Sequence, residues 1–172
     1  GGAVFIKIQV VKNRSRAYAG INKANVTAIN RIGIEAMAQH SAVSEMLSAT
    51  VGGVAVGISV SYVYLNSSNI ATINADGATI KAKGIYINAG KENDYNNATA
   101  KATALTANAG AVSVGVNTAI ADNKAINNAL ISGSLTGLIE AGSLSIYAYG
   151  NSVANAHLLG ISAGSISILA SF

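Results

Sequence analysis

The sequence has no cysteine, proline or tryptophan in its 172 residues, and aromatic and charged side chains are scarce. Without cysteine there can be no disulfide, thiolate metal site or cysteine nucleophile. Proline removes a backbone donor and is confined to the edges and bulges of sheets, so its absence suits a chain that is paired on both sides. Aromatic residues make up 5% and charged residues 10%, so the 51% hydrophobic content is mostly alanine, valine and isoleucine. Such side chains fit a narrow interior better than a spherical core.

No targeting segment or membrane-spanning helix is visible in the sequence. The first residues lack the basic start, apolar stretch and cleavage site of a signal peptide, and we expect any export signal to lie outside this segment. Val51–Val63 is apolar, but it is too short to span a membrane as a helix, and glycine and serine interrupt it.

The net charge of +4 is unevenly distributed along the chain. A basic cluster without any acidic residue occupies the first 31 positions and consists of Lys7, Lys12, Arg14, Arg16, Lys23 and Arg31. Basic surfaces attract polyanions, so these residues are candidate contacts for anionic glycans. The alternative is a solvated face near one end of the segment. Because the cluster lacks the interleaved aromatic residues on which bases stack, we do not expect nucleic acid as a partner.

Internal repetition is the most informative feature of the sequence. The segment Val54–Gly57 recurs as Val112–Gly115 and, more loosely, as Ile166–Ile168, at a spacing of fifty-odd residues. A second set lies between these copies and matches Ile32–Ala36 to Ile85–Ala89 and Leu144–Ala148. The same register aligns three sets of positions, which are Leu47, Leu105 and Leu159; Ala49, Ala107 and Ile161; and Val51, Ala109 and Ala163.

Within each copy, apolar residues alternate with small polar ones, as in Val54, Val56, Ile58 and Val60. This period of two predicts half-buried strands whose apolar face points into a core. The stretch Glu35–Ala49 could form a short helix, but its aligned copies alternate after a turn, and we interpret all three as loop plus strand.

Together these features predict an all-β fold, a parallel β-helix or β-solenoid in which equivalent strands stack at about 4.8 Å. A unit of this length suggests two or three coils per repeat, so we predict roughly six to nine coils and a stack of about 30–45 Å. The whole of residues 1–172 would form one solenoid segment of a larger exported protein, with a basic, less regular part at 1–31 and clear repeats over 32–172.

Candidate catalytic residues and metal ligands do not emerge from the sequence, and we expect no cofactor. His40 and His157 stand in separate repeats without a partner motif and are interpreted as solvent-facing or loop histidines. The carboxylates do not recur in one column, although acids grouped on one face would allow a polysaccharide-cleaving enzyme. Glycosylation is a further hypothesis, because Asn-x-Ser/Thr sequons occur at Asn13, Asn25, Asn66 and Asn97.

Three segments carry a resemblance to a known family. Ala78–Ala89, Ala109–Asn117 and Ile139–Ala148 resemble the passenger repeats of large two-partner-secretion exoproteins, a group that includes filamentous haemagglutinins and the fusobacterial leukotoxin type. The resemblance covers most of Ile32–Phe172 and implies a right-handed parallel β-helix. It also implies export from a Gram-negative bacterium through an outer-membrane partner translocator, and a role in adhesion or host-cell damage. The family's amino-terminal secretion domain is not present, which suggests an interior or distal passenger piece.

The sequence therefore predicts a structural and adhesive rod, not an enzyme, that is secreted or displayed on the bacterial cell surface. Its expected partners are a host-cell surface glycan or protein receptor. The alternatives are a polysaccharide-cleaving enzyme on the same fold, the passenger of a secreted cytotoxin, and an extracellular filament that self-associates end to end.

Overall fold

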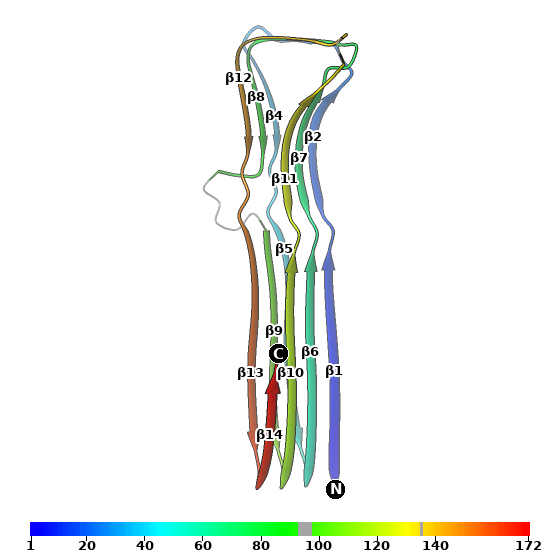
Figure 1. Ribbon diagram of the computed structural model, residues 1–172, viewed down its shortest axis with the longest axis vertical. Helices are drawn as coiled ribbons and strands as arrows, with labels where there is room; N and C mark the ends of the chain where they lie inside the picture. The colour runs from blue at the N-terminus through cyan, green and yellow to red at the C-terminus, as the bar shows by residue number, and fades with distance from the viewer. Residues whose placement is uncertain (93–97, 135) are drawn as a thin grey trace.

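The computed structural model describes residues 1–92, 98–134 and 136–172, which form fourteen β-strands and no helix (Figure 1). The strands are β1 (Gly2–Asn13), β2 (Arg16–Asn22), β3 (Val26–Thr27), β4 (Arg31–Ala36), β5 (His40–Val51), β6 (Val54–Leu65), β7 (Ser68–Asn74), β8 (Thr79–Ala89), β9 (Ala98–Ala109), β10 (Val112–Asn123), β11 (Ile126–Ser132), β12 (Leu138–Ala148), β13 (Ser152–Ala163) and β14 (Ile166–Ser171).

All strand pairs are parallel, and the chain passes through four sheets in turn before it returns to the first. Sheet A has the order β1-β6-β10-β14, sheet B has the order β11-β7-β2, and sheet D has the order β13-β9-β5. In sheet C, β8 pairs with β12 on one edge and with both β3 and β4 on the other. This is the predicted parallel β-solenoid.

The repeat register predicted from the sequence is confirmed. Leu105 of β9 lies opposite Leu47 of β5 on one side and Leu159 of β13 on the other. In sheet C, Ile85 is the partner of both Ile32 and Leu144. The interpretation of Glu35–Ala49 as loop plus strand is also confirmed, because β4 ends at Ala36 and β5 begins at His40.

The predicted number of coils is wrong. Each fifty-odd-residue repeat makes one circuit of the solenoid, so β1–β5, β6–β9 and β10–β13 form three coils and β14 begins a fourth. The stack is therefore about 15 Å deep along its axis at the spacing of parallel strands. The error arose from strand length: β5, β6, β9 and β10 each contain 12 residues, about twice the usual strand, so a single coil absorbs the whole repeat.

Each coil is long and flat and has two parts (Figure 1). Sheets B and C enclose an apolar core that includes Ile73, Ile80, Ile85 and Ile87, as the alternation predicted. Sheets A and D face each other in the other part. A smaller apolar cluster with Val63, Leu65 and the buried alanines of β9 lies between them.

Much of the remaining interior between sheets A and D is polar, although Met46 and Ala55 are also buried there. Ser59 of sheet A lies 2.7 Å from Ser48 of sheet D and 2.8 Å from Thr106, measured between the hydroxyl oxygens. Thr106 donates to Asn117 of β10, and Ser61 donates to Ser44 at 2.8 Å. Buried hydroxyls thus satisfy one another across a thin, closely packed sandwich, as buried polar groups must.

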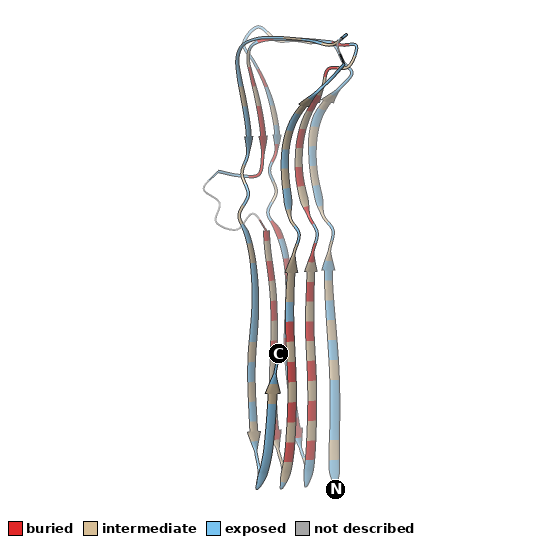
Figure 2. Cartoon of the chain, viewed as in Figure 1, coloured by how far each residue is buried: buried red, intermediate tan, exposed pale blue. Residues whose placement is uncertain are grey.

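The prediction that Val54, Val56, Ile58 and Val60 line the interior is wrong. The inward positions in this part of β6 are Ala55, Gly57, Ser59 and Ser61, followed by Val63 and Leu65, whereas Val54, Val56, Ile58 and Val60 point to the outside (Figure 2). The column of Leu47, Leu105 and Leu159 also lies on the outer face of sheet D, with Leu47 69% exposed. Alternation fixes the two faces of a strand but not which face is inside. Here the inward positions of sheets A and D hold mostly alanine, glycine, serine and threonine, with Met46, Val63 and Leu65 as larger buried side chains.

Candidate functional site

The corner between sheets A and B is where the basic residues come together. In the first coil the chain bends between β1 and β2, at Arg14 and Ser15. The next coil follows it, since Asn66 donates its backbone N–H to Asn13 at 2.9 Å and Ser68 donates to Ser15 at 3.1 Å. In the third coil the Asn123 side chain accepts a hydrogen bond from the Ala125 backbone at 3.2 Å, which stabilises the bend. The parallel ladder therefore continues through the corner and holds successive residues in columns.

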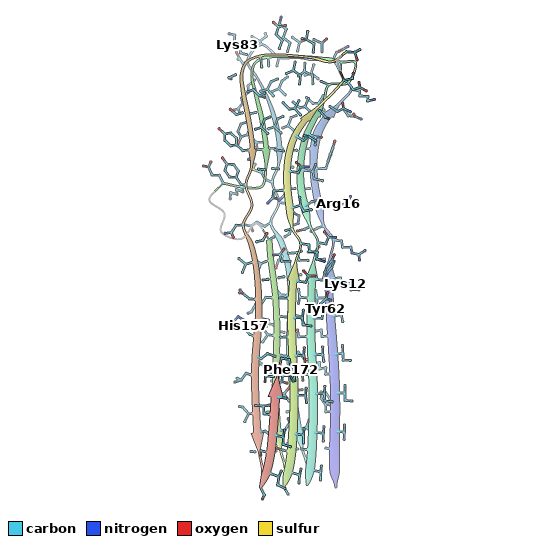
Figure 3. All side chains as sticks on the ribbon, viewed as in Figure 1. Lys12, Arg16, Tyr62, Lys83, His157 and Phe172 are labelled. Atoms are coloured by element: carbon cyan, nitrogen blue, oxygen red, sulfur yellow. The ribbon has the colours of Figure 1, made fainter. Side chains whose placement is uncertain are left out.

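Four exposed cations surround this bend, and we call them the cationic corner: Lys12, Arg14, Arg16 and Lys124. Lys12 ends the outward-facing row of β1, and Arg16 begins β2, so the two lie on either side of the bend (Figure 3). Arg14 and Lys124 belong to the same column two coils apart, which corresponds to about 10 Å between their backbones.

Tyrosines of the second coil stand between these cations. Tyr64 is the register partner of both Lys12 and Asp122, and the Lys124 ammonium lies 5.5 Å from the centre of its ring. Tyr62 occupies the adjacent outward position on β6 (Figure 3). Asp122 lies 3.6 Å from Lys124 and balances one of the four positive charges. The result is a surface with excess positive charge and aromatic rings beside it.

The other three predicted basic residues lie elsewhere. Lys7 projects toward sheet D and donates to the Leu47 carbonyl oxygen at 3.4 Å. Arg31, in β4, lies 5.9 Å from the centre of the Tyr86 ring on the outer face of sheet C. Lys23 follows β2 and pairs with Asp76. The sequence prediction therefore united six residues that the fold divides among four places.

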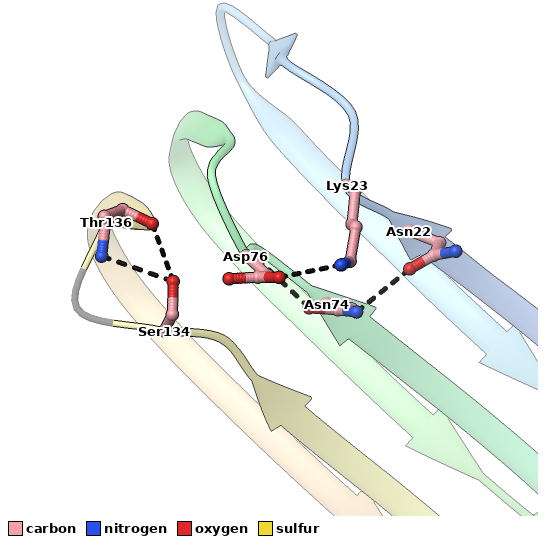
Figure 4. Close-up of polar contacts among 6 residues, drawn as sticks. All are labelled: Asn22, Lys23, Asn74, Asp76, Ser134 and Thr136. Carbon is pink, nitrogen blue, oxygen red and sulfur yellow. Dashed lines mark hydrogen bonds and ion pairs between the residues drawn. The ribbon is translucent and has the colours of Figure 1, made fainter.

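Lys23 belongs to a stack of turns at the far end of sheet B (Figure 4). Its ammonium lies 2.7 Å from the Asp76 carboxylate, and the Asn74 side chain donates to Asn22 at 3.0 Å. The hydrogen bond from Lys23, followed by one from Ser134, lowers the pKa of Asp76 below its usual value. Because Asp76 balances its charge, Lys23 serves to join the first two coils and contributes little to the attraction of an anion.

Lys124, Tyr62 and Tyr64 were missed in the sequence because they are distant from the basic segment along the chain. The repeat alignment contained the signal. The offset that pairs Val54 with Val112 also pairs Tyr64 with Asp122, and the same column continues to Lys12. The neighbouring coil thus supplies Tyr62 and Tyr64 beside the basic residues of the first coil.

The sequons occupy different environments. Asn13 donates its side-chain amide to the Ser41 carbonyl oxygen at 2.7 Å, and Asn25 accepts a hydrogen bond from the Thr79 backbone at 2.7 Å. Asn66 is exposed at the cationic corner, and Asn97 lies outside the described residues. Glycosylation at these positions stays a prediction.

His40 is buried, contrary to the expectation of a solvent-facing or loop histidine. Its Nδ1 lies 2.7 Å from Ser15 Oγ, and its Nε2 lies 3.3 Å from Asn69 Oδ1. The Asn69 amide also donates to Ala38 at 3.1 Å and to Asn127 at 2.8 Å. Ser15, His40 and Asn69 resemble a nucleophile triad in composition, but these contacts fasten the start of sheet D to sheet B, and His40 is only 5% exposed.

Four of the carboxylates, those of Glu45, Asp76, Asp122 and Glu140, each lie beside a lysine. Glu45 is 3.3 Å from Lys101 on the outer face of sheet D, and Glu140 is 2.8 Å from Lys81 in sheet C. Over residues 1–92, 98–134 and 136–172, no group of three or more His, Asp or Glu side chains is placed to hold a metal ion. Nor does that part of the chain contain a helix long and apolar enough to cross a membrane.

Comparisons with known proteins give no family or neighbour. No family model, curated protein or solved structure matches this chain.

Proposed function

We propose that this chain is an adhesive segment of a larger exported bacterial surface protein, and that its cationic corner binds anionic glycans. The observation that carries the proposal is that Lys12, Arg14, Arg16 and Lys124 are exposed at one bend of the ladder, with Tyr64 beside Lys12 and Lys124. Arginine guanidinium groups bind sulfate and carboxylate groups in a bidentate manner. Aromatic faces supply apolar contact area beside them.

The solenoid suits an adhesive role because it is built by repetition. Every coil adds about 4.8 Å and continues the same columns, so a chain with more coils would extend the ladder without a new fold. Contacts between exposed charges and a glycan are individually weak and screened by salt. Repeated sites along a rod would add avidity that a single corner lacks. The resemblance of the repeats to those of secreted exoproteins supports the same assignment.

The test measures binding of heparin, a sulfated glycan, over a range of salt concentrations. We expect the double variant Arg14→Gln/Arg16→Gln to bind at least about tenfold more weakly and with a flatter salt dependence. The matched control is Lys81→Gln/Lys83→Gln, which removes the same charge from sheet C and should change affinity by less than about twofold.

Two results would contradict the proposal. Equal losses in both double variants would show that only the net charge of +4 matters, without a specific site. Equal affinity for heparin and for single-stranded DNA of matched charge would show a general polyanion surface without glycan preference.

A further inference from the structure

Most of the outer face of sheet A is an uncharged surface of branched side chains, and its charged residues, Lys12 and Asp122, lie at the end beside the cationic corner. We call the uncharged part the A face, and it consists of Val4, Ile6, Ile8, Val10, Val54, Val56, Ile58, Val60, Tyr62, Val112, Val114, Val116, Thr118, Ile120, Ile166, Ile168 and Ala170. Parallel register places like residues side by side, as in the row of Val4, Val56, Val114 and Ile168.

This face is open to solvent in the isolated chain. Val4 is 71% and Ile8 66% exposed at one edge, and Ile168 is 57% exposed at the other. Contiguous apolar patches larger than a few hundred Å² are rare on soluble monomers and mark interaction surfaces. The A face measures about 30 Å along the strands and about 17 Å across them, or on the order of 500 Å².

We propose that a second copy of this chain covers the A face with its own A face, related by a two-fold axis. Two such patches together remove about 1,000 Å² of flat area from solvent, which reaches the size of a specific interface even before surface relief is counted. A two-fold contact requires a surface that is complementary to itself. Rows of valine and isoleucine without charge meet that requirement, and the two sheets would pack about 10 Å apart.

Charge distribution favours a second copy on this face and not on sheet D. The chain carries a net +4, but none of those charges lies in the A face, so two copies can approach there without repulsion. The outer face of sheet D also has leucines, but the ion pair of Glu45 and Lys101 interrupts it, and His157 stands in the third coil. The A face is therefore the more continuous apolar surface.

Sedimentation of the full chain at increasing concentration tests the proposal. We expect a species of twice the 17.2 kDa chain mass that does not grow further, because a two-fold contact closes. Ile58→Lys, at the centre of the face, should raise the concentration needed for pairing at least about tenfold, since it places a charge in the interface. The matched control Leu159→Lys, on sheet D, should leave pairing unchanged.

Single-cysteine variants give a second readout that does not depend on a charged substitution, because the chain has no cysteine of its own. The thiol of Ile58→Cys should react with a soluble thiol reagent in dilute samples. At concentrations where the dimer forms, its reaction rate should fall at least about tenfold. The thiol of Leu159→Cys should react equally at both concentrations.

Four outcomes would overturn the proposal. The chain could stay monomeric at every concentration, or form open-ended polymers through the solenoid ends. Pairing could survive both lysine substitutions, or the thiol of Ile58→Cys could be protected even in the dilute monomer. Protection of Ile58→Cys by phosphatidylcholine vesicles with no protein dimer would assign the face to lipid and equally refute a second copy.

Discussion

At the scale of single residues, glycine at the end of sheet D sets how closely the coils stack. Gly52, Gly110 and Gly164 occupy one column, because the Gly52 and Gly110 backbones donate at 3.0 Å to Ala109 and Ala163 of the following coil. A Cβ on Gly110 would overlap the Gly52 carbonyl oxygen, and one on Gly164 would overlap the Gly110 carbonyl oxygen. Backbone atoms cannot move aside as the end of a side chain can, so this column admits no side chain without separating the coils.

We therefore predict that Gly110→Ala destabilises the fold by about 2–3 kcal/mol, the usual cost of overpacking. Urea denaturation measures the effect. Gly33→Ala is the matched control, because a Cβ at Gly33 meets no atom within 4 Å and Gly33 does not have a positive φ. Gly33→Ala should change the free energy of unfolding by less than about 1 kcal/mol. The change should be stabilising if the lower conformational entropy of the unfolded chain is the main effect. Similar losses in the two variants would contradict the role of the column.

At the scale of the strand, sheets A and D invert the usual relation between polarity and burial. Ser59 and Ser61 are fully buried, whereas Val54, which begins the same strand, is 48% exposed. Ser44, Ser48, Ser59, Ser61, Thr106 and Asn117 bond to one another across the two sheets, whereas Thr50 Oγ1 and Asn108 Oδ1 are buried without a partner. The sandwich is thin enough that a Cβ at Gly115 would lie 2.7 Å from the Asn108 amide nitrogen, so the Asn108 side chain would have to move.

This arrangement predicts an unusual pair of substitutions in β6. Ser59→Val introduces extra volume and removes the hydrogen bonds to Ser48 and Thr106, so it should destabilise the monomer by about 2–4 kcal/mol. Val60→Ser changes an outward position and should cost less than about 1 kcal/mol in dilute samples. Thermal unfolding of the two variants measures the difference, and the reverse order would place the valines inside the solenoid.

The strands and their register could be predicted from the sequence. Which side of each strand points into the core, and how many coils the chain forms, could not. Matching Leu47 to Leu105 and Leu159 requires only that equivalent residues recur, and parallel stacking then brings them together. Whether that column faces the core depends on what the opposite sheet presents, and no local pattern contains this information. For the same reason, Lys12 and Arg16 were recognisable as basic, while the neighbours Tyr64 and Lys124 became apparent only when the coils were stacked.

At the scale of the whole molecule, and over the described residues, the second coil is the one whose strands in all four sheets are paired on both edges; in the third coil β10 alone has a second neighbour, β14. Strands β6, β7, β8 and β9 are each paired on two edges, whereas β1, β2 and β5 are paired on one. Burial follows the same order: Ile85 and Ile87 of the second coil are almost completely buried, while their partners in the third coil, Leu144 and Ile146, are 51% and 43% exposed (Figure 2). In a solenoid, stability is a sum of terms between adjacent repeats, so the outer coils should open first.

Hydrogen exchange on a dilute monomeric sample tests this directly. We expect amides of β6, β8 and β9 to exchange slowest, with rates close to that of global unfolding, and amides of β1 and β14 to exchange through local opening at least about tenfold faster. Pairing through the A face should slow exchange little, because it covers side chains and leaves the hydrogen-bonding edges of β1 and β5 free. Uniform protection across all three coils would contradict this gradient, and it would show that the ends are covered by end-to-end contacts between copies.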